Sequence, residues 1–91
     1  MTTRVLATQD AKTAATQLIQ LSGQLREEIA KVIVQGNKLA DQNQWDGNLA
    51  QAWRSDWIND QKQLQNSSQQ LDSLQKRAQQ AVQNILQAGG D

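Results

Sequence analysis

The 91-residue chain contains no cysteine and no histidine, and these two absences remove most catalytic and metal-binding chemistry. Without cysteine there are no disulfides, thiolate nucleophiles or Cys-type metal sites. Without histidine the usual general base and the commonest transition-metal ligand are missing, so a Ser or Cys triad is excluded. We therefore expect no enzymatic activity, no cofactor and no metal.

The chain also lacks an excess of charge and a long apolar run. Nine basic and nine acidic side chains cancel, so there is no field of one sign that would attract nucleic acid or an anionic membrane. No apolar segment approaches the roughly 18 residues of a membrane span, and residues 1–10 lack the apolar stretch of a secretory signal peptide. We expect neither nucleic-acid binding, nor direct membrane insertion, nor a cleavable signal.

Proline, phenylalanine and tyrosine are absent too, while eighteen residues are glutamine. A short chain with so few large apolar groups buries a small core and is expected to take apolar surface from a partner. Glutamine, alanine, leucine, lysine and arginine all favour helix, and no proline interrupts them. Regularly spaced Leu, Ile and Val argue against a disordered glutamine tract. The composition predicts an all-α fold.

Two amphipathic stretches are separated by a polar connection. In the first, steps of three or four residues predict a helix over about 8–41, and its 3-4-4-3-4-4 spacing predicts a nearly straight one. Ile19, Ile33 and Leu39 widen its apolar stripe, as expected of a helix that touches two neighbours. The second stretch predicts a helix over about 49–87, followed by a short tail.

The connection, about residues 42–48, is rich in polar turn formers around one tryptophan and one glycine. Asp46 or Asn48 is expected to cap the second helix, and Gly47 suits a tight reversal that needs a positive φ. Trp45 has two open interpretations, a recognition side chain at the tip or a side chain that pins the turn.

A short connection between two long helices predicts an antiparallel two-helix hairpin as the single domain, residues 1–91. A single hairpin leaves the outer edges of both apolar stripes exposed to water, so we expect it to dimerise into a four-helix bundle. Glycines 23 and 36 are expected to mark close approach of the helices, with simple tolerance as the alternative. The expected dimer interface comprises Leu18, Leu21, Leu25, Ile29, Val32, Leu49, Trp53 and Trp57.

Other candidate reactive groups have simpler explanations. Asp56 and Asp60 share a face, but like charges at this spacing are usually just solvated carboxylates. Glu27 and Glu28 point in different directions, and Ser67-Ser68 has no base near it in sequence. We assign no catalytic residue.

The tripeptide Trp45-Asp46-Gly47, midway along a helical chain of this length without cysteine, resembles the WXG family of small type VII secretion substrates. The stretch from Leu21 to Leu25, followed by Ile29 and Val32, looks like the matching part of the early-secreted-antigen and culture-filtrate-protein branch. The resemblance extends over essentially the whole chain.

This resemblance implies a non-enzymatic protein that folds in the cytoplasm and is then secreted or displayed at the cell surface through an ESX-like system. The implied partners are a second copy or a paralogous hairpin, an FtsK/SpoIIIE-type secretion ATPase and, in some cases, a larger secreted effector. The family is associated with virulence. Its export signal combines the Trp-x-Gly turn with a Tyr-x-x-x-Asp/Glu motif after the second helix.

The chain departs from the family pattern at the second part of this signal, because it has no tyrosine. Ile85 falls near the usual tyrosine position, and Gln87 and Asp91 belong to the degenerate remainder of the motif. Either this branch of the family tolerates another residue in place of the tyrosine, or a partner subunit supplies the tail signal. The alternative function is a cytoplasmic structural or adaptor hairpin whose wide stripe docks a larger protein.

Overall fold

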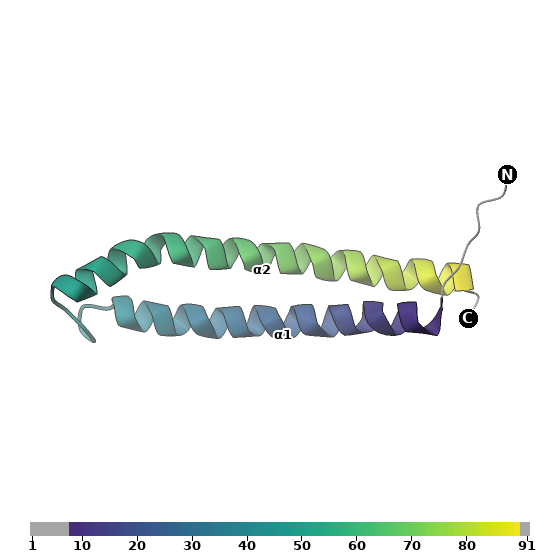
Figure 1. Cartoon of the computed structure of the whole chain (residues 1–91), viewed down its shortest axis with the longest axis horizontal. Helices are drawn as coiled ribbons and strands as arrows, with labels where there is room; N and C mark the ends of the chain where they lie inside the picture. Colours follow the sequence, from purple (N-terminus) through teal and green to yellow (C-terminus); the bar gives the residue numbers. More distant parts are fainter. Residues whose placement is uncertain (1–7, 90–91) are drawn as a thin grey trace.

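The fold is a pair of long helices lying side by side and running in opposite directions (Figure 1). The computed structural model describes residues 8–89, with α1 spanning Gln9–Ala40 and α2 spanning Asn48–Gly89. No strand occurs within these residues, which confirms the predicted all-α hairpin. Helix α1 is one residue shorter than expected at each end. Helix α2 begins one residue before its expected start and ends two residues after its expected end.

Both ends of α1 are closed by local hydrogen bonds. The Thr8 hydroxyl accepts a 3.1 Å bond from the Ala11 N–H, which satisfies a backbone donor that has no partner inside the helix. At the other end the backbone turns at Asp41, whose N–H donates to the Lys38 carbonyl at 3.2 Å. Asp10 in the first turn and Lys38 in the last complement the helix dipole.

The connection between the helices is a compact polar turn followed by a glycine. Asp41 accepts bonds from the N–H groups of Asn43, Gln44 and Trp45, through its carboxylate for Asn43 and through its carbonyl for the other two. Gly47 has φ +117°, a conformation that L side chains rarely adopt. Its carbonyl accepts the first bond of α2, from the Gln51 N–H at 2.9 Å. Gly47 therefore occupies the capping position that we expected of Asp46 or Asn48.

The surfaces of α1 and α2 that face each other are here called the seam, and the residues buried in it are small except for one tryptophan. Ala15, Ser22 and Gly36 are buried there, and Ala50, Trp57 and Ala78 are buried on α2. Small residues let two helix backbones approach closely. The wide apolar stripe expected on α1 is thus divided between two surfaces. Its leucines lie beside the seam, each about one residue before a seam position, and stay exposed.

The hairpin is one layer thick, with extents of 68 × 23 × 14 Å. No large side chain is completely buried within the described residues. The chain exposes 6983 Å², whereas a compact monomer of this mass exposes about 5300 Å². A single copy therefore leaves unusually much surface in water.

Candidate interaction surfaces

The tip of the hairpin presents Trp45 on a loop that is anchored to α2. The Arg54 guanidinium donates to the Trp45 carbonyl at 3.2 Å and to the Asp46 carboxylate at 3.1 Å. The Trp45 side chain makes none of the hydrogen bonds recorded at the tip, and the residue is 38% exposed. Arg54 thus holds the turn through the backbone of Trp45, while over a third of the residue stays accessible, as a recognition side chain requires.

The charge of Asp46 contributes to the same anchoring. The Gly47 backbone N–H, which donates to its carboxylate at 2.8 Å, is the main influence that lowers the pKa of Asp46 below the ordinary value, and Arg54 adds to the effect. Both groups stabilise the ionised form. The tip loop is therefore held most firmly when Asp46 is charged.

Trp53 and Trp57 of α2 stack on each other at the end of the seam nearest the tip. Trp57 is 6% exposed, and its indole ring lies against Gly36 in the space that a Cβ at position 36 would occupy. The indole N–H donates to the Asn37 side-chain oxygen at 2.9 Å, so the buried ring has no unsatisfied donor. Trp53 stacks on Trp57 with ring centroids 5.6 Å apart and donates to the Gly36 carbonyl.

The two glycines inside α1 therefore have different roles. Gly36 marks a close approach of the helices, as expected, because a larger residue there would collide with Trp57. A Cβ at Gly23 would meet only the end of the Gln75 side chain, at 3.6 Å. This is an ordinary contact with a flexible group, so Gly23 is a case of tolerance.

One broad face of the hairpin carries most of the exposed apolar side chains, and we call it the leucine face. Leu18, Leu21 and Leu25 follow helical spacing on α1, and all three are more than two-fifths exposed. The α2 part of the face is half-buried. Its members are Leu18, Leu21, Leu25, Val32 and Leu39 on α1 and Trp53, Leu64, Leu71 and Leu74 on α2.

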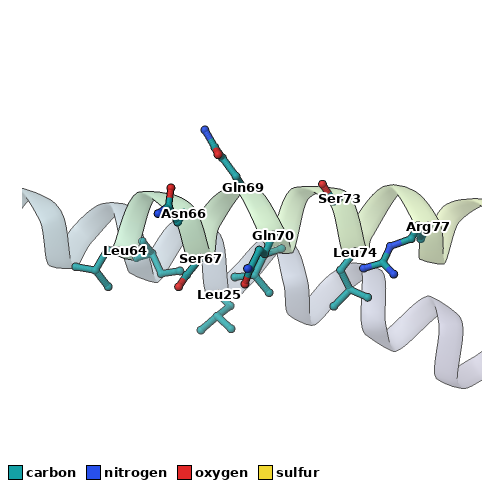
Figure 2. A pocket seen from close by; sticks show the side chains of 11 residues that line it. Leu25, Leu64, Asn66, Ser67, Gln69, Gln70, Ser73, Leu74 and Arg77 are labelled. Carbon is teal, nitrogen blue, oxygen red and sulfur yellow. The ribbon is translucent and has the colours of Figure 1, made fainter. Parts of the chain in front are cut away.

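Of the open grooves along this face, two are lined by both helices. The larger one, about 1010 Å³, lies where Leu25 and Ile29 of α1 meet Leu64 and Leu74 of α2. Figure 2 shows Leu25, Leu64 and Leu74 pointing to the same side of the hairpin. The smaller groove, about 360 Å³ and mostly apolar, is lined by Val32, Gly36, Leu39, Trp53 and Trp57 with a rim of Glu28, Lys31 and Gln35.

The middle of the seam contains an ion pair instead of an apolar layer. Arg26 donates to the Asp72 carboxylate at 3.1 Å and reaches Gln75 at 3.5 Å, while Lys76 pairs with Asp72 from the outside. The Arg26 Nε is buried without a hydrogen-bond partner. A polar layer of this kind stabilises little but disfavours other registers of the two helices, since sliding would leave these charges unpaired.

The structure separates the residues expected at the dimer interface into two groups. Leu18, Leu21, Leu25, Val32 and Leu49 are exposed and accessible to a partner, with Leu49 at 78%. Ile29 and Trp53 are half-buried and border both the seam and the leucine face. Trp57 is buried within the hairpin, so its main contacts are inside its own chain.

The two parts of the expected export signal lie at opposite ends of the hairpin. Trp45, Asp46 and Gly47 form the tip, whereas Ile85 and Gln87 lie in the last turns of α2, Ile85 half-buried and Gln87 exposed. Asp91 lies outside the described residues. One chain alone therefore does not bring the two parts together.

Sequence analysis missed Arg54 and the pair formed by Arg26 and Asp72. Arg54 lies eight residues after Asp46, and only the fold of the loop brings these charges together. The other pair joins residues 46 positions apart. A charged residue at a seam position of a predicted helix is the only sequence signal that points to such a pair.

Residues 8–89 contain no group of three or more Asp or Glu side chains arranged to hold a metal ion. Neither described helix combines the length and the hydropathy that crossing a membrane requires. No protein-family model, no curated protein and no solved structure matches the chain.

Proposed function

We propose that this chain is a WXG-type hairpin, a non-enzymatic protein exported through, or serving as a targeting partner for, a type VII secretion system. The observation that carries the proposal is the tip. There the Trp-x-Gly tripeptide lies at the reversal between two long helices, Trp45 is exposed, and Arg54 fixes the loop. The resemblance assigns this tripeptide to export.

The proposed mechanism is recognition rather than catalysis. An exposed indole offers a large apolar surface and one hydrogen-bond donor, which suits a contact with another protein. The Arg54 contacts hold the loop before binding, so less conformational entropy is lost when a partner docks. The proposed reader is an FtsK/SpoIIIE-type ATPase of the secretion machinery.

Dimerisation would complete the recognition surface. In an antiparallel pair of hairpins, the tip of one copy lies beside the end of α2 of the other. Ile85 and Gln87 of one chain would then neighbour Trp45 of its partner. The ATPase would read a composite surface that exists only in a correctly paired dimer, which couples export to assembly.

The first test is an export assay. The tagged chain is followed in culture supernatant and cytosol of its source cell, with and without the secretion ATPase and with its partner co-expressed. We expect it outside the cell only when the ATPase is present. Retention inside in both strains, with a cytosolic marker behaving normally, would favour the adaptor hairpin instead.

The second test locates the signal at the tip. Trp45→Ala removes the exposed ring and leaves the Arg54 contact to the backbone, so we expect normal helicity and loss of export. Ile58→Ala is the matched control, because Ile58 is also an exposed large apolar residue, 63% accessible, but lies on α2 away from the tip. Normal export of Trp45→Ala would refute the role of the tip.

A further inference from the structure

The step from Asp46 to Gly47 in the tip loop brings together a carboxyl group and a backbone nitrogen that can react with each other. It is the only place in the sequence where glycine follows an aspartate or an asparagine. The Gly47 N–H donates to the Asp46 carboxylate at 2.8 Å, so the carboxyl carbon lies no more than about 4 Å from that nitrogen. Two groups held this close in one loop react without the cost of first finding each other.

The surroundings of this step leave room for a reaction. Both residues precede α2, and the Gly47 N–H bonds to the side chain of Asp46 rather than to a helical carbonyl. A Cβ at position 47 would meet nothing within 4 Å, and glycine has no side chain that hinders attack by its own nitrogen. The Asp46 side chain is 60% exposed, so water reaches the carboxyl group.

We propose that the step from Asp46 to Gly47 is a site of spontaneous covalent modification, at which the aspartate is converted through a cyclic succinimide into isoaspartate, and that Arg54 slows this conversion. No enzyme or cofactor is needed, because the reactants are the chain itself and water. The modification does not depend on the proposed function. Only its consequence for export rests on that function.

The first chemical step closes a ring between side chain and backbone. The Gly47 nitrogen attacks the carboxyl carbon of Asp46 while the carboxyl group is protonated, and a carbon–nitrogen bond forms. The carboxyl hydroxyl and the hydrogen of the Gly47 N–H leave together as a water molecule. The product is a succinimide, and nothing is oxidised or reduced.

The second step opens the ring by adding a water molecule to either of its carbonyl carbons. Addition at the side-chain carbon of Asp46 breaks the new bond and restores aspartate. Addition at the main-chain carbon breaks the original peptide bond, so the chain then runs through the side-chain carbons, which is isoaspartate. The overall reaction changes no atom count, but it lengthens the backbone between Trp45 and Gly47 by a carbon atom.

Arg54 opposes the first step. Its guanidinium donates to the Asp46 carboxylate at 3.1 Å and to the Trp45 carbonyl at 3.2 Å, and its side chain is only 19% exposed. The Gly47 N–H and, to a lesser extent, Arg54 hold the pKa of Asp46 below its ordinary value of 3.8, so little of the reactive neutral acid is present. The contacts that anchor the tip loop therefore also protect it chemically.

Isomerisation would alter the surface that we assign to export. The additional backbone carbon shifts Trp45 relative to Gly47, and the free carboxylate is then attached to a different carbon from the one that faces Arg54 now. Modified chains would keep both helices and lose the geometry of the tip. Recognition would then be restricted to recently synthesised protein.

The first experiment follows the modification in the purified chain during incubation at neutral pH and raised temperature. Trypsin releases the peptide from Leu39 to Arg54, and chromatography separates its isoaspartyl and aspartyl forms. Fragmentation in the mass spectrometer then locates the isomerised residue. We expect isoaspartate at Asp46 and none at Asp41, which is exposed in the same loop but is followed by glutamine and accepts from the Asn43 N–H. Isoaspartate at neither residue, or equally at both, would overturn the proposal.

Two substitutions at Asp46 test the chemistry. Asp46→Glu keeps the carboxylate but has to close a larger ring, so the isomer should not accumulate. Asp46→Asn offers a neutral amide that needs no protonation before attack. An ordinary aspartate is neutral only about once in a thousand at pH 7, so the asparagine variant should form isoaspartate about tenfold faster or more. Equal rates for the two variants would contradict a succinimide route.

Arg54→Gln tests the protection. We expect isoaspartate to form severalfold faster, because the carboxyl group is neutral more often and the loop is held less firmly. Lys62→Gln is the matched control, since it removes the same charge from an exposed position further along α2. An unchanged rate in Arg54→Gln, with circular dichroism showing intact helices, would overturn the protective role.

The consequence for export is measured separately in the source cell. Exported and retained chains are isolated and mapped in the same way, and isoaspartate at position 46 should be enriched in the retained pool. Equal amounts in the two pools would overturn the effect on export. If no chain is exported at all, the proposed function fails, whereas the modification is still decided by the rates in the purified protein.

Discussion

Two neighbouring surfaces of α1 differ in composition. The difference is the reverse of the one expected of a protein that is stable as a monomer. On α1 the seam buries only Ala15, Ser22 and Gly36, and it holds the charged Arg26 together with isoleucines at positions 19, 29 and 33 that are half-buried. The leucine face, which borders solvent, has three leucines within eight residues. Apolar burial is the main favourable term in folding, so a chain selected to be stable alone would place its leucines inside.

The two surfaces therefore contribute differently to the hairpin. Small residues and one ion pair bring the helices together closely and in one register, which fixes the shape of the hairpin. The leucines of α1 and Val32 are exposed and accessible to another protein. Under the proposed function, the surface between the helices fixes the shape of the hairpin before a partner binds the other surface.

The largest effect is expected where the seam has its single large buried side chain. Trp57→Ala removes the ring that fills the space above Gly36 and leaves a cavity, which costs about 3–5 kcal/mol for a buried aromatic side chain. We expect the urea midpoint, followed by circular dichroism, to fall sharply. Trp57→Phe keeps most of the ring and should lose less. Equal midpoints for Trp57→Ala and the unaltered chain would contradict the importance of this contact.

Replacing each of the two glycines of α1 by alanine compares a tightly packed position with a loosely packed one. Gly36→Ala places a Cβ in the Trp57 ring, and overpacking costs about 1–3 kcal/mol, more than the helix gains from alanine. Gly23→Ala meets only the flexible end of Gln75 and should stabilise the helix by about 1 kcal/mol. Thermal unfolding of the two variants should therefore shift in opposite directions. Shifts in the same direction would show that the seam is looser than described.

The leucine face is tested against the opposite side of the same helix. Leu25 and Val34 are both 51% exposed, but only Leu25 lies on the leucine face. Leu25→Ala should weaken self-association by about 2 kcal/mol per dimer, since each copy loses the exposed half of one leucine that the interface would cover. Val34→Ala should leave association unchanged. Sedimentation equilibrium over a range of concentrations gives both values, and equal effects would refute a one-sided interface.

The smallest effect concerns the tip. Because the pKa of Asp46 is lowered, its ionised contacts contribute fully above its ordinary value of 3.8 and are lost as the pH falls through the lowered pKa. Carboxyl NMR titration should give a pKa for Asp46 below that value. Arg54→Gln should raise it only part of the way, because the Gly47 N–H is the larger influence. A full return to the ordinary value would contradict this order.

The fold was largely predictable from sequence because helical spacing and the absence of proline are local properties. The positive φ of Gly47 followed from the same kind of reasoning. The division of the stripe was not predictable, because a wide stripe allows several rotations of one helix against the other. Small residues such as Ser22 decide the rotation, and their effect depends on the helix opposite.

The candidate sites show the same limit. Trp45 was identified from its tripeptide, but its anchoring by Arg54 depends on the path of the loop. The contrast between Gly36 and Gly23 depends on which side chain of α2 lies opposite each one. Properties that depend on partners distant in sequence require the three-dimensional arrangement.

The position of the tryptophans has a consequence for spectroscopy. All three lie between residues 45 and 57, at the tip or in the seam beside it, and they range from exposed Trp45 to buried Trp57. Intrinsic fluorescence of this protein therefore reports on the tip end alone. Fraying of the opposite end, where α1 begins and α2 ends, changes the helical circular dichroism and leaves the emission spectrum unaltered. A mismatch between the two signals during unfolding would measure how independently the two ends of the rod behave.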